Sequence, residues 1–281
     1  MANLQSRIPV ALTIAGSDSG GGAGIQADLR TFAFHCVHGT SALTCVTAQN
    51  TLGVNRVDAL LPEAVSAQIA AVAEDIGVQA TKTGMLLNAG IIRQVANQVE
   101  QYSLQPLVVD PVMVSRTGAQ LIDDRAISAL RKDLFPLATL ITPNRYEAEI
   151  LTGSKIETLD QMYKAAEEIY HQLQVPAVLI KGGSLEASSR GIDVYFDGQQ
   201  QQILQTLMIE TPHTHGTGCT LSAAIAANLA KGQDLFAAIG EAKDYVTQAL
   251  QFSLAIGQGQ GPVGHFFPLL SSNSLTSDSV H

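Results

Sequence analysis

Residues 214–230 read THGTGCTLSAAIAANLA, and this stretch decides the fold. Gly216 and Gly218 allow a tight turn that brings bare backbone N–H groups close to a bound anion. The small and apolar residues behind them predict a buried helix over residues 219–230, which Gly232 can end. Because the unpaired N–H groups and the helix dipole point the same way, such a turn suits a phosphate or an oxyanion. Close packing of a helix start against a sheet would require the same glycines.

A second glycine-rich loop lies near the other end of the chain, at residues 15–24 (AGSDSGGGAG). It follows an apolar run and leads into a predicted helix. The spacing does not fit the G-x-G-x-x-G pattern, and the chain has no Gly-Lys-Ser/Thr, so neither a Rossmann fingerprint nor a Walker loop is present. Glycines directly after a buried strand indicate that a ligand or another backbone approaches closely, although a flexible connection has the same composition.

Strand-like runs alternate with helical patterns along the chain. The predicted strands cover residues 10–15, 39–48, 80–84, 107–109, 140–142, 177–181 and 191–196, and residues 199–207 complete a hairpin. The predicted helices cover residues 24–34, 62–75, 89–101, 124–134, 145–151, 159–173, 219–230 and 235–252. This order predicts an α/β fold with a mostly parallel sheet, helices on both faces and ligands at the carboxyl ends of the strands. We expect one domain over residues 1–270 and a disordered tail over residues 271–281.

The composition argues against several classes of protein. With 16 Lys and Arg residues against 25 Asp and Glu, the formal net charge is −9, whereas a nucleic-acid surface needs a basic face. Cys36, Cys45 and Cys219 form no C-x-x-C pair, so neither a disulfide framework nor a zinc site is expected. No run approaches the roughly 20 apolar residues that span a bilayer. We therefore expect a cytoplasmic protein that binds neither nucleic acid nor membrane.

Polar side chains follow several of the predicted strands. Asp110 comes after the apolar run 107–109, and Lys181 closes the run 177–181. At a strand end, a carboxylate can hold Mg²⁺ through water and a lysine can reach a nucleotide phosphate. A turn-capping aspartate before Pro111 and a surface lysine are the structural alternatives.

Amide and histidine side chains give less specific signals. Asn144 could cap a helix with Glu147 as its capping-box partner, which is the better explanation of that pair alone. Gln49 follows a buried run, and its amide can donate and accept at once, which suits a ring with an amino group beside a ring nitrogen. His213 and His215 form an H-x-H pair without a third ligand, which favours a structural or ligand-facing role over zinc.

Several segments form a jointly specific set of motifs. They are residues 11–28 (ALTIAGSDSGGGAGIQAD), 47–51 (TAQNT), 82–86 (KTGML), 110–113 (DPVM), 215–219 (HGTGC) and 261–266 (GPVGHF). Together they resemble the hydroxymethylpyrimidine and phosphomethylpyrimidine kinases of thiamine biosynthesis, in the ribokinase-like superfamily. The resemblance covers nearly the whole chain. It implies a three-layer α/β fold, a central mostly parallel sheet flanked by helices, and ATP- and Mg²⁺-dependent phosphorylation of a small pyrimidine and its monophosphate.

The resemblance also implies roles for individual residues. The pyrimidine pocket would be lined by Gly16, Asp28, Gln49, Met85, Val112 and Cys219. The waters and the ion of a Mg²⁺ site would be organised by Asp110 and Glu147, and the ATP phosphates would be held by Asn144, Lys181 and Thr214. The anion hole for the transferred phosphoryl group would be formed by the N–H groups of Gly216, Thr217, Gly218 and Cys219. Family members are commonly dimers, which implies a homodimer here.

Cys219 stands where most ribokinase-like relatives place an aspartate. We expect the helix N-terminus to lower the pKa of this thiol, so that it can serve as the base. Relatives often carry histidine in the C-terminal Gly-x-Gly stretch, whereas this chain has GQGQG at residues 257–261, which puts nucleotide contacts of that segment in doubt. The alternatives are a pyridoxal or pyridoxine kinase and a non-catalytic sensor of the phosphopyrimidine. A nicotinamide-dependent oxidoreductase lacks support, because its fingerprint is missing.

Overall fold

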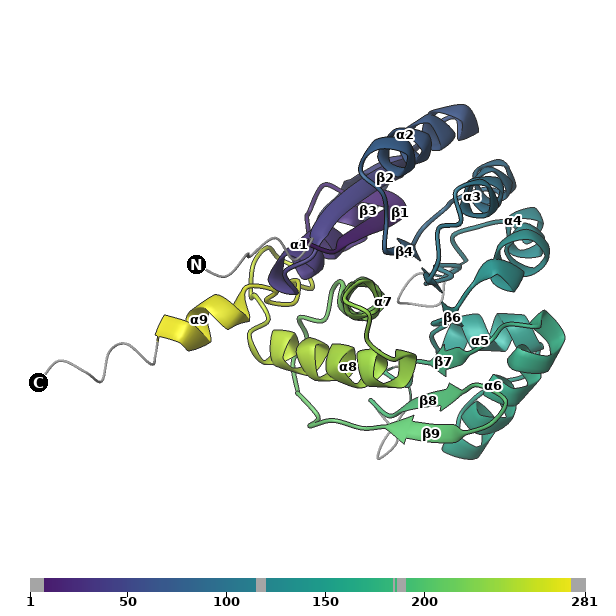
Figure 1. Ribbon diagram of the computed structural model, residues 1–281. Helices are drawn as coiled ribbons and strands as arrows, with labels where there is room; N and C mark the ends of the chain where they lie inside the picture. Colours follow the sequence, from purple (N-terminus) through teal and green to yellow (C-terminus); the bar gives the residue numbers. More distant parts are fainter. Residues whose placement is uncertain (1–7, 115–119, 184, 186–190, 274–281) are drawn as a thin grey trace, which may run out of the picture.

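The computed structural model describes residues 8–114, 120–183, 185 and 191–273. Within these residues the strands form one nine-stranded sheet in the order β3-β2-β1-β4-β5-β6-β7-β8-β9 (Figure 1). The strands are β1 (Val10–Asp18), β2 (His38–Gln49), β3 (Val54–Ala59), β4 (Ala80–Thr83), β5 (Leu107–Val109), β6 (Leu140–Ile141), β7 (Val178–Ile180), β8 (Asp193–Phe196) and β9 (Gln201–Leu204). Neighbouring strands in the run β2-β1-β4-β5-β6-β7 pair in parallel. The remaining pairs, β3 with β2, β8 with β7 and β9 with β8, are antiparallel. The predicted mostly parallel sheet is confirmed.

Helices cover both faces of the sheet (Figure 1). One buried apolar cluster joins the sheet to α2 (Pro62–Asp75), α3 (Ala89–Gln101), α4 (Asp124–Ala129), α5 (Arg145–Thr152) and α6 (Leu159–Leu173). A second cluster, on the opposite face, joins it to α1 (Gly24–Phe34), α7 (Thr217–Ala230) and α8 (Leu235–Gln251). The expected three-layer α/β architecture is therefore confirmed.

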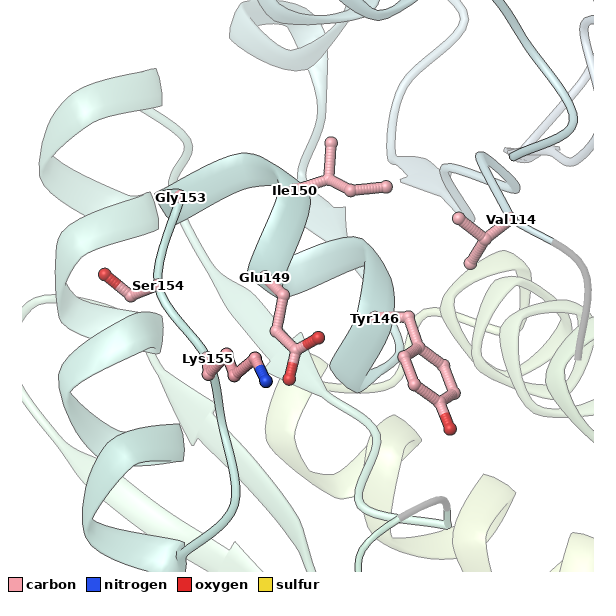
Figure 2. Close-up of a pocket in the computed structure, with 7 residues that line it drawn as sticks. All are labelled: Val114, Tyr146, Glu149, Ile150, Gly153, Ser154 and Lys155. Carbon is pink, nitrogen blue, oxygen red and sulfur yellow. The ribbon is translucent and has the colours of Figure 1, made fainter. Parts of the chain in front are cut away.

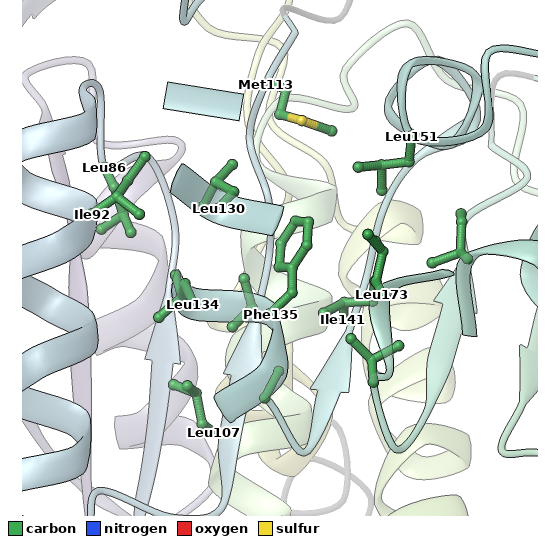
Figure 3. Packing of buried hydrophobic residues seen from close by; sticks show 14 of the residues in the cluster. Leu86, Ile92, Leu107, Met113, Leu130, Leu134, Phe135, Ile141, Leu151 and Leu173 are labelled. Carbon is green, nitrogen blue, oxygen red and sulfur yellow. The ribbon is translucent and has the colours of Figure 1, made fainter. Parts of the chain in front are cut away.

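The central strands alternate their side chains between the two clusters. Leu107 and Val109 of β5 belong to the first cluster and Val108 belongs to the second. Figure 3 shows the first cluster, where Leu107 and Ile141 of the sheet lie near Phe135. Because both faces of such a strand are buried, its sequence is a continuous apolar run. Each large side chain buried in this way contributes about 1.5–3 kcal/mol to stability.

α7 lies in the interior of the second helical layer. Residues 220–228 and Ala230 are all buried, so the helix is covered around its whole circumference. Its small side chains let the sheet and α8 approach closely, and the Asn228 amide donates to the Ala238 carbonyl of α8 at 3.3 Å. α7 has 14 residues, and no helix in the described part of the chain is both long and apolar enough to cross a membrane.

The element bounds differ from the predicted ones at a few places. α1, α2, α3 and α6 match their predicted ranges, whereas the helix predicted over residues 124–134 divides into α4 and a π-helical turn at Leu130–Leu134. β3 and α9 (Phe267–Asn273) were not predicted. α9 runs three residues into the expected tail. Residues 274–281 lie outside the described residues.

An ion pair is completely buried between α1 and β4. The Lys82 ammonium lies 2.8 and 3.0 Å from the two carboxylate oxygens of Asp28, and the Thr13 hydroxyl of β1 donates to the same carboxylate at 2.6 Å. Both charged side chains have no exposed surface. Burial alone would lower the pKa of Lys82, but the Asp28 carboxylate raises it above its usual value. Burial also raises the pKa of the Asp28 carboxyl group, against the opposing effect of Lys82. The contacts among Asp28, Lys82 and Thr13 tie three elements together.

We predict that Lys82→Met lowers the free energy of unfolding by about 3–5 kcal/mol, because it leaves the Asp28 carboxylate buried without its partner. The double variant Lys82→Met with Asp28→Leu removes both charges and should regain most of this loss. Urea denaturation of the two variants and of the wild-type chain measures the effect. A double variant as unstable as Lys82→Met would contradict this explanation.

Candidate active site

The carboxyl ends of β1 and β4 to β7 meet at one edge of the sheet because these strands are parallel. Asp110 follows β5, and its N–H donates to the Thr83 carbonyl of β4 at 3.0 Å. Lys181 follows β7, and its N–H donates to the Pro143 carbonyl, which follows β6, at 2.9 Å. The strand-end residues predicted from the sequence therefore lie on neighbouring strands.

The two glycine loops are in direct contact. Gly216 caps α7 with a left-handed backbone (φ 86°), and a Cβ at this position would lie 1.8 Å from the Gly22 carbonyl oxygen. A Cβ on Gly24 would lie 2.3 Å from the Gly16 carbonyl oxygen. Only glycine fits either position. Close approach of a second backbone, one of the two explanations of the first loop, is thus present.

The start of α7 lies beside the strand-end ion pair of Asp110 and Lys181. The Lys181 ammonium is 2.8 Å from Oδ1 of Asp110, and both side chains are largely buried. A Cβ on Gly218 would lie 3.4 Å from Nζ of Lys181 and 3.8 Å from Oδ2 of Asp110. Burial alone would lower the pKa of Lys181, but the carboxylates of Asp110 and Glu147 raise it. The lysine is therefore a fixed positive charge beside the first turn of the helix.

Asn144 and Glu147 form the capping box of α5. Oδ1 of Asn144 accepts the Glu147 N–H at 3.0 Å, and Oε2 of Glu147 accepts the Asn144 N–H at 2.8 Å. Oε1 of Glu147 accepts the Met113 N–H at 3.1 Å. Burial and, to a lesser extent, the Asp110 carboxylate raise the pKa of Glu147 to about 7, against the opposing effect of Lys181.

The donor set fits a hydrated magnesium ion better than a metal held by protein ligands alone. Among the described residues, no group of three or more His, Cys, Asp or Glu side chains could hold a metal. Mg²⁺ usually keeps several waters and binds one or two carboxylates together with substrate phosphates. Asp110 and Glu147 are both buried, and the Asp110 carboxylate is close enough to raise the pKa of Glu147. A divalent cation would relieve this repulsion between the two carboxylates.

Cys219 lies in the first turn of α7 and is half-buried. Burial raises the pKa of its thiol to about 11; Asp28 and Asp110 add to this, while Lys82 and a hydrogen bond from the Gly24 N–H oppose it. The expectation of a lowered pKa is therefore wrong, because desolvation together with the two carboxylates outweighs the lowering by Lys82 and the Gly24 N–H. At neutral pH the group is a thiol.

The residues expected around the ring differ in how accessible they are. A Cβ on Gly16 would lie 2.7 Å from Sγ of Cys45 and 3.0 Å from Cε of Met85, so these three residues are close together. Met85, Gln49, Val112 and Thr214 are half-buried, and Asp28 is completely buried. With its carboxylate engaged by Lys82 and Thr13, Asp28 presents no surface to a ligand in this structure, contrary to expectation.

Comparison with known proteins identifies the family. The model of the phosphomethylpyrimidine kinase family matches residues 18–264. The chain belongs to this family. It is 62% identical over 262 residues to the hydroxymethylpyrimidine/phosphomethylpyrimidine kinase of Synechococcus elongatus, covering 93% of this chain and 99% of that one. It is 43% identical over 258 residues to the pyridoxine kinase of Bacillus subtilis, covering 91% and 95%.

A solved structure supports the ribokinase-like fold. The ADP complex of Bacillus subtilis pyridoxal kinase superposes with a TM-score of 0.87 at 42% identity and covers 94% of this chain and 99% of that one. The expected fold class is confirmed. The chain is therefore a kinase of the phosphomethylpyrimidine kinase family, with its two glycine loops and strand-end ion pair in one place.

The C-terminal glycine segment of this kinase lies against the turn after β2. The Gly259 N–H donates to the Thr51 hydroxyl at 3.2 Å, and the Gln260 N–H donates to the Thr51 carbonyl at 3.0 Å. The Gly261 N–H donates to Nδ1 of His213 at 3.0 Å, which gives that histidine a structural contact. Residues 257–261 therefore support the end of β2 that carries Gln49.

Two cavities on the surface of this kinase lie apart from the residues expected at the site. One, of about 310 Å³, is lined by residues of α5, by Val114 and by residues 153–155 (Figure 2). The other, of about 500 Å³, lies between residues of α4, α5 and α6. Neither contains a residue predicted to bind substrate, nucleotide or metal.

Sequence reasoning missed the role of three residues at this site. Lys82 was quoted only within a motif, and Asp18 only within the first glycine loop, yet both form buried ionic contacts. No interaction partner was predicted for His215. The structure places its Nε2 2.9 Å from Oδ2 of Asp18. The available signal was an aspartate at the end of a buried strand, which resembles the pattern that drew attention to Asp110.

We predict that Gly216→Ala lowers turnover by roughly 100-fold or more, because the new methyl group would displace the turn that presents the N–H groups. Gly232→Ala is a matched control at the other end of α7, since Gly232 is also left-handed (φ 83°) but has open space around it. The control should lose about 1 kcal/mol of stability and keep its activity. Steady-state rates and thermal unfolding distinguish the two; equal losses of activity would contradict the steric explanation.

Proposed function

We propose that the chain transfers the terminal phosphoryl group of ATP to the hydroxymethyl group of 4-amino-5-hydroxymethyl-2-methylpyrimidine, and then to the resulting monophosphate, giving the diphosphate used in thiamine biosynthesis. Membership of the family and the 62% identity to a hydroxymethylpyrimidine/phosphomethylpyrimidine kinase support this proposal. The homodimer and the cytoplasmic location that the resemblance implies are part of the same proposal.

The observation that carries the proposal is the position of the Gly218 turn beside the ion pair of Lys181 and Asp110. Phosphoryl transfer passes through a loose transition state with charge spread over the phosphoryl oxygens. Backbone N–H groups at a helix start and a fixed lysine charge stabilise such an oxyanion. In the proposed reaction, the N–H groups of residues 216–219 bind the transferred group, and Lys181, Asn144 and Thr214 bind the ATP phosphates.

Asp110 and Glu147 would hold Mg²⁺ through its waters. When bound, the ion neutralises charge on the phosphates and orients them. For this role Glu147 has to be ionised, and its pKa of about 7 places that ionisation near neutral pH. The capping box keeps both Glu147 oxygens beside the N–H groups of Met113 and Asn144, so the carboxyl group is already oriented.

Cys219 acts in this proposal as the group that orients the acceptor hydroxyl. A thiol with a pKa of about 11 is a weak acid at neutral pH, but a loose transition state does not require a strong base before the phosphoryl group moves. The Gly24 N–H donates a hydrogen bond to the sulfur from the start of α1. The ring would be contacted by Gln49, Gly16, Met85 and Val112. Asp28 would act on the pocket only indirectly, through its ion pair with Lys82.

The second candidate is pyridoxine or pyridoxal phosphorylation. The 43% identity to a pyridoxine kinase and the TM-score of 0.87 to a pyridoxal kinase favour it specifically. Both reactions transfer phosphate to a hydroxymethyl group on a six-membered ring, so the machinery at the start of α7 serves either one. The choice therefore depends on the contacts to the ring.

Product analysis tests the proposal directly. We expect incubation with hydroxymethylpyrimidine and Mg-ATP to give both the monophosphate and the diphosphate, detected by mass spectrometry. Pyridoxine and pyridoxal are incubated in parallel. Phosphorylation of the pyridoxine-type rings alone would replace the proposed function with the second candidate, and a chain that consumes no ATP with any ring would refute both. Light scattering of the same sample tests the homodimer.

We predict that Cys219→Ala lowers kcat by roughly 100-fold, since it removes the group that positions the acceptor hydroxyl for attack. Binding of a non-hydrolysable ATP analogue, measured by calorimetry, should persist. Cys36→Ala is the control, because Cys36 is exposed and lies outside the site. Unchanged turnover of Cys219→Ala would exclude a catalytic role for the thiol.

A further inference from the structure

A carboxylate that the proposed reaction does not use holds the first glycine loop together. Oδ1 of Asp18 accepts the Gly20 N–H at 2.8 Å, and Oδ2 accepts the N–H groups of Gly22 and Ala23 at 3.0 and 2.8 Å. Burial alone would raise the pKa of Asp18, but hydrogen bonds from His215 and from the loop hold this pKa below its usual value. The carboxylate is therefore ionised at neutral pH and can only accept hydrogen bonds.

His215 joins this carboxylate to Gln49. Its Nε2 lies 2.9 Å from Oδ2 of Asp18 and, with the Gln49 carboxamide as the structure places it, 3.4 Å from the amide nitrogen of Gln49. Because the carboxylate only accepts, Nε2 must carry a hydrogen and donate it to Asp18. An Nε2 that carries a hydrogen has no free lone pair, so it can face only an acceptor. The carboxamide oxygen of Gln49 therefore belongs on the His215 side.

Thr47 requires the same orientation from the other side. Its hydroxyl oxygen lies 2.9 Å from the Ser17 carbonyl oxygen and 3.3 Å from Oε1 of Gln49, so the orientation argued here turns the amide over relative to its placement in the structure. A backbone carbonyl only accepts, so the single hydroxyl hydrogen goes to Ser17 and the hydroxyl oxygen is left to accept from Gln49. The NH₂ group therefore belongs on the Thr47 side. The two ends of a carboxamide have nearly the same shape, and the surrounding hydrogen bonds decide between them.

We propose that this network locks the carboxamide of Gln49 in one orientation, and that the locked amide determines which ring the enzyme accepts. Asp18, His215 and Thr47 are then positioning residues that act through Gln49. Two independent neighbours favour the same orientation, because Nε2 of His215, which donates its hydrogen to Asp18, cannot accept from an NH₂ group, and the Thr47 hydroxyl, which donates its hydrogen to Ser17, can only accept. The main chain of the first glycine loop supplies the rest of the network, so loop and amide are held as one unit.

The inference rests on the proposed function, in which Gln49 faces the substrate ring. The locked amide keeps one free lone pair on its His215 side and one free N–H on its Thr47 side. A ring with an amino group beside a ring nitrogen offers a donor next to a pure acceptor, and these match the amide in one order only. A pyridoxine-type ring carries hydroxyl groups, which either donate or accept, so it does not depend on that order.

Nuclear magnetic resonance of the full chain tests the orientation without any turnover. With labelled glutamine side chains and threonine methyl groups, we expect a nuclear Overhauser contact between the Gln49 NH₂ group and the Thr47 methyl group. Long-range nitrogen couplings should show a hydrogen on Nε2 of His215. Gln49→Glu identifies the signal by removing it. A contact from the NH₂ group to the His215 ring, with a bare Nε2, would overturn the proposal.

A pair of variants tests the effect on specificity. Thr47→Val removes the hydroxyl with little change of shape and should lower kcat/KM for hydroxymethylpyrimidine roughly three- to tenfold, mainly through KM, because it costs one neutral hydrogen bond. Thr47→Ser keeps the hydroxyl and should restore the wild-type value. Pyridoxine, followed by turnover or by calorimetric binding, should change less than about twofold in both variants.

The outcomes separate this inference from the proposed function. Equal losses for both rings in Thr47→Val, or no rescue by Thr47→Ser, would indicate a purely structural role and refute the inference alone. If the wild-type chain phosphorylates neither ring, the proposed function fails, and the resonance contacts still decide whether the amide is locked.

Discussion

The contact between Gly216 and the Gly22 carbonyl is the constraint on which the rest of the site depends. It joins the loop after β1 to the turn before α7, two segments almost two hundred residues apart in the sequence. Neither position tolerates a Cβ, so the loop and the turn are packed backbone to backbone. The N–H groups at the start of α7, the Cys219 thiol and the Asp18 carboxylate are thereby held at fixed positions relative to one another.

Two of the buried acidic side chains have a basic partner from a different element. Asp28 of α1 pairs with Lys82 of β4, and Asp110 after β5 pairs with Lys181 after β7. Such pairs contribute little net stability against an apolar alternative, yet removing one partner is costly. Their effect is therefore to fix where α1, β4, β5 and β7 meet. The same charges set the electrostatics around Cys219, where Lys82 opposes the carboxylates and burial outweighs both.

The sequence was sufficient for the parallel sheet and for the residues at its carboxyl ends, because buried parallel strands read as apolar runs and the site follows from topology. It was insufficient for β3, whose six residues are all exposed and lack an apolar face. It also failed for the pKa of Cys219 and for the burial of Asp28. Both depend on how deeply neighbouring elements cover a side chain, and the local sequence carries no record of that. The partnership of Asp18 with His215 spans 197 positions, beyond any local pattern.

Discrimination between two vitamin-sized rings in this family has to rest on a few polar atoms. A pyridoxine kinase that shares 43% of its residues with this chain, and a pyridoxal kinase that superposes with a TM-score of 0.87, leave little room for a difference in pocket shape. One methylene or hydroxyl in an apolar pocket changes selectivity only modestly, whereas an unmatched buried donor or acceptor costs about 1–3 kcal/mol. An amide whose orientation is fixed by Asp18, His215 and Thr47 can impose such a mismatch. A ring with the wrong order of donor and acceptor cannot make the amide rotate to match it. In the proposed function, selectivity therefore depends on the hydrogen-bond network behind Gln49 as much as on Gln49 itself.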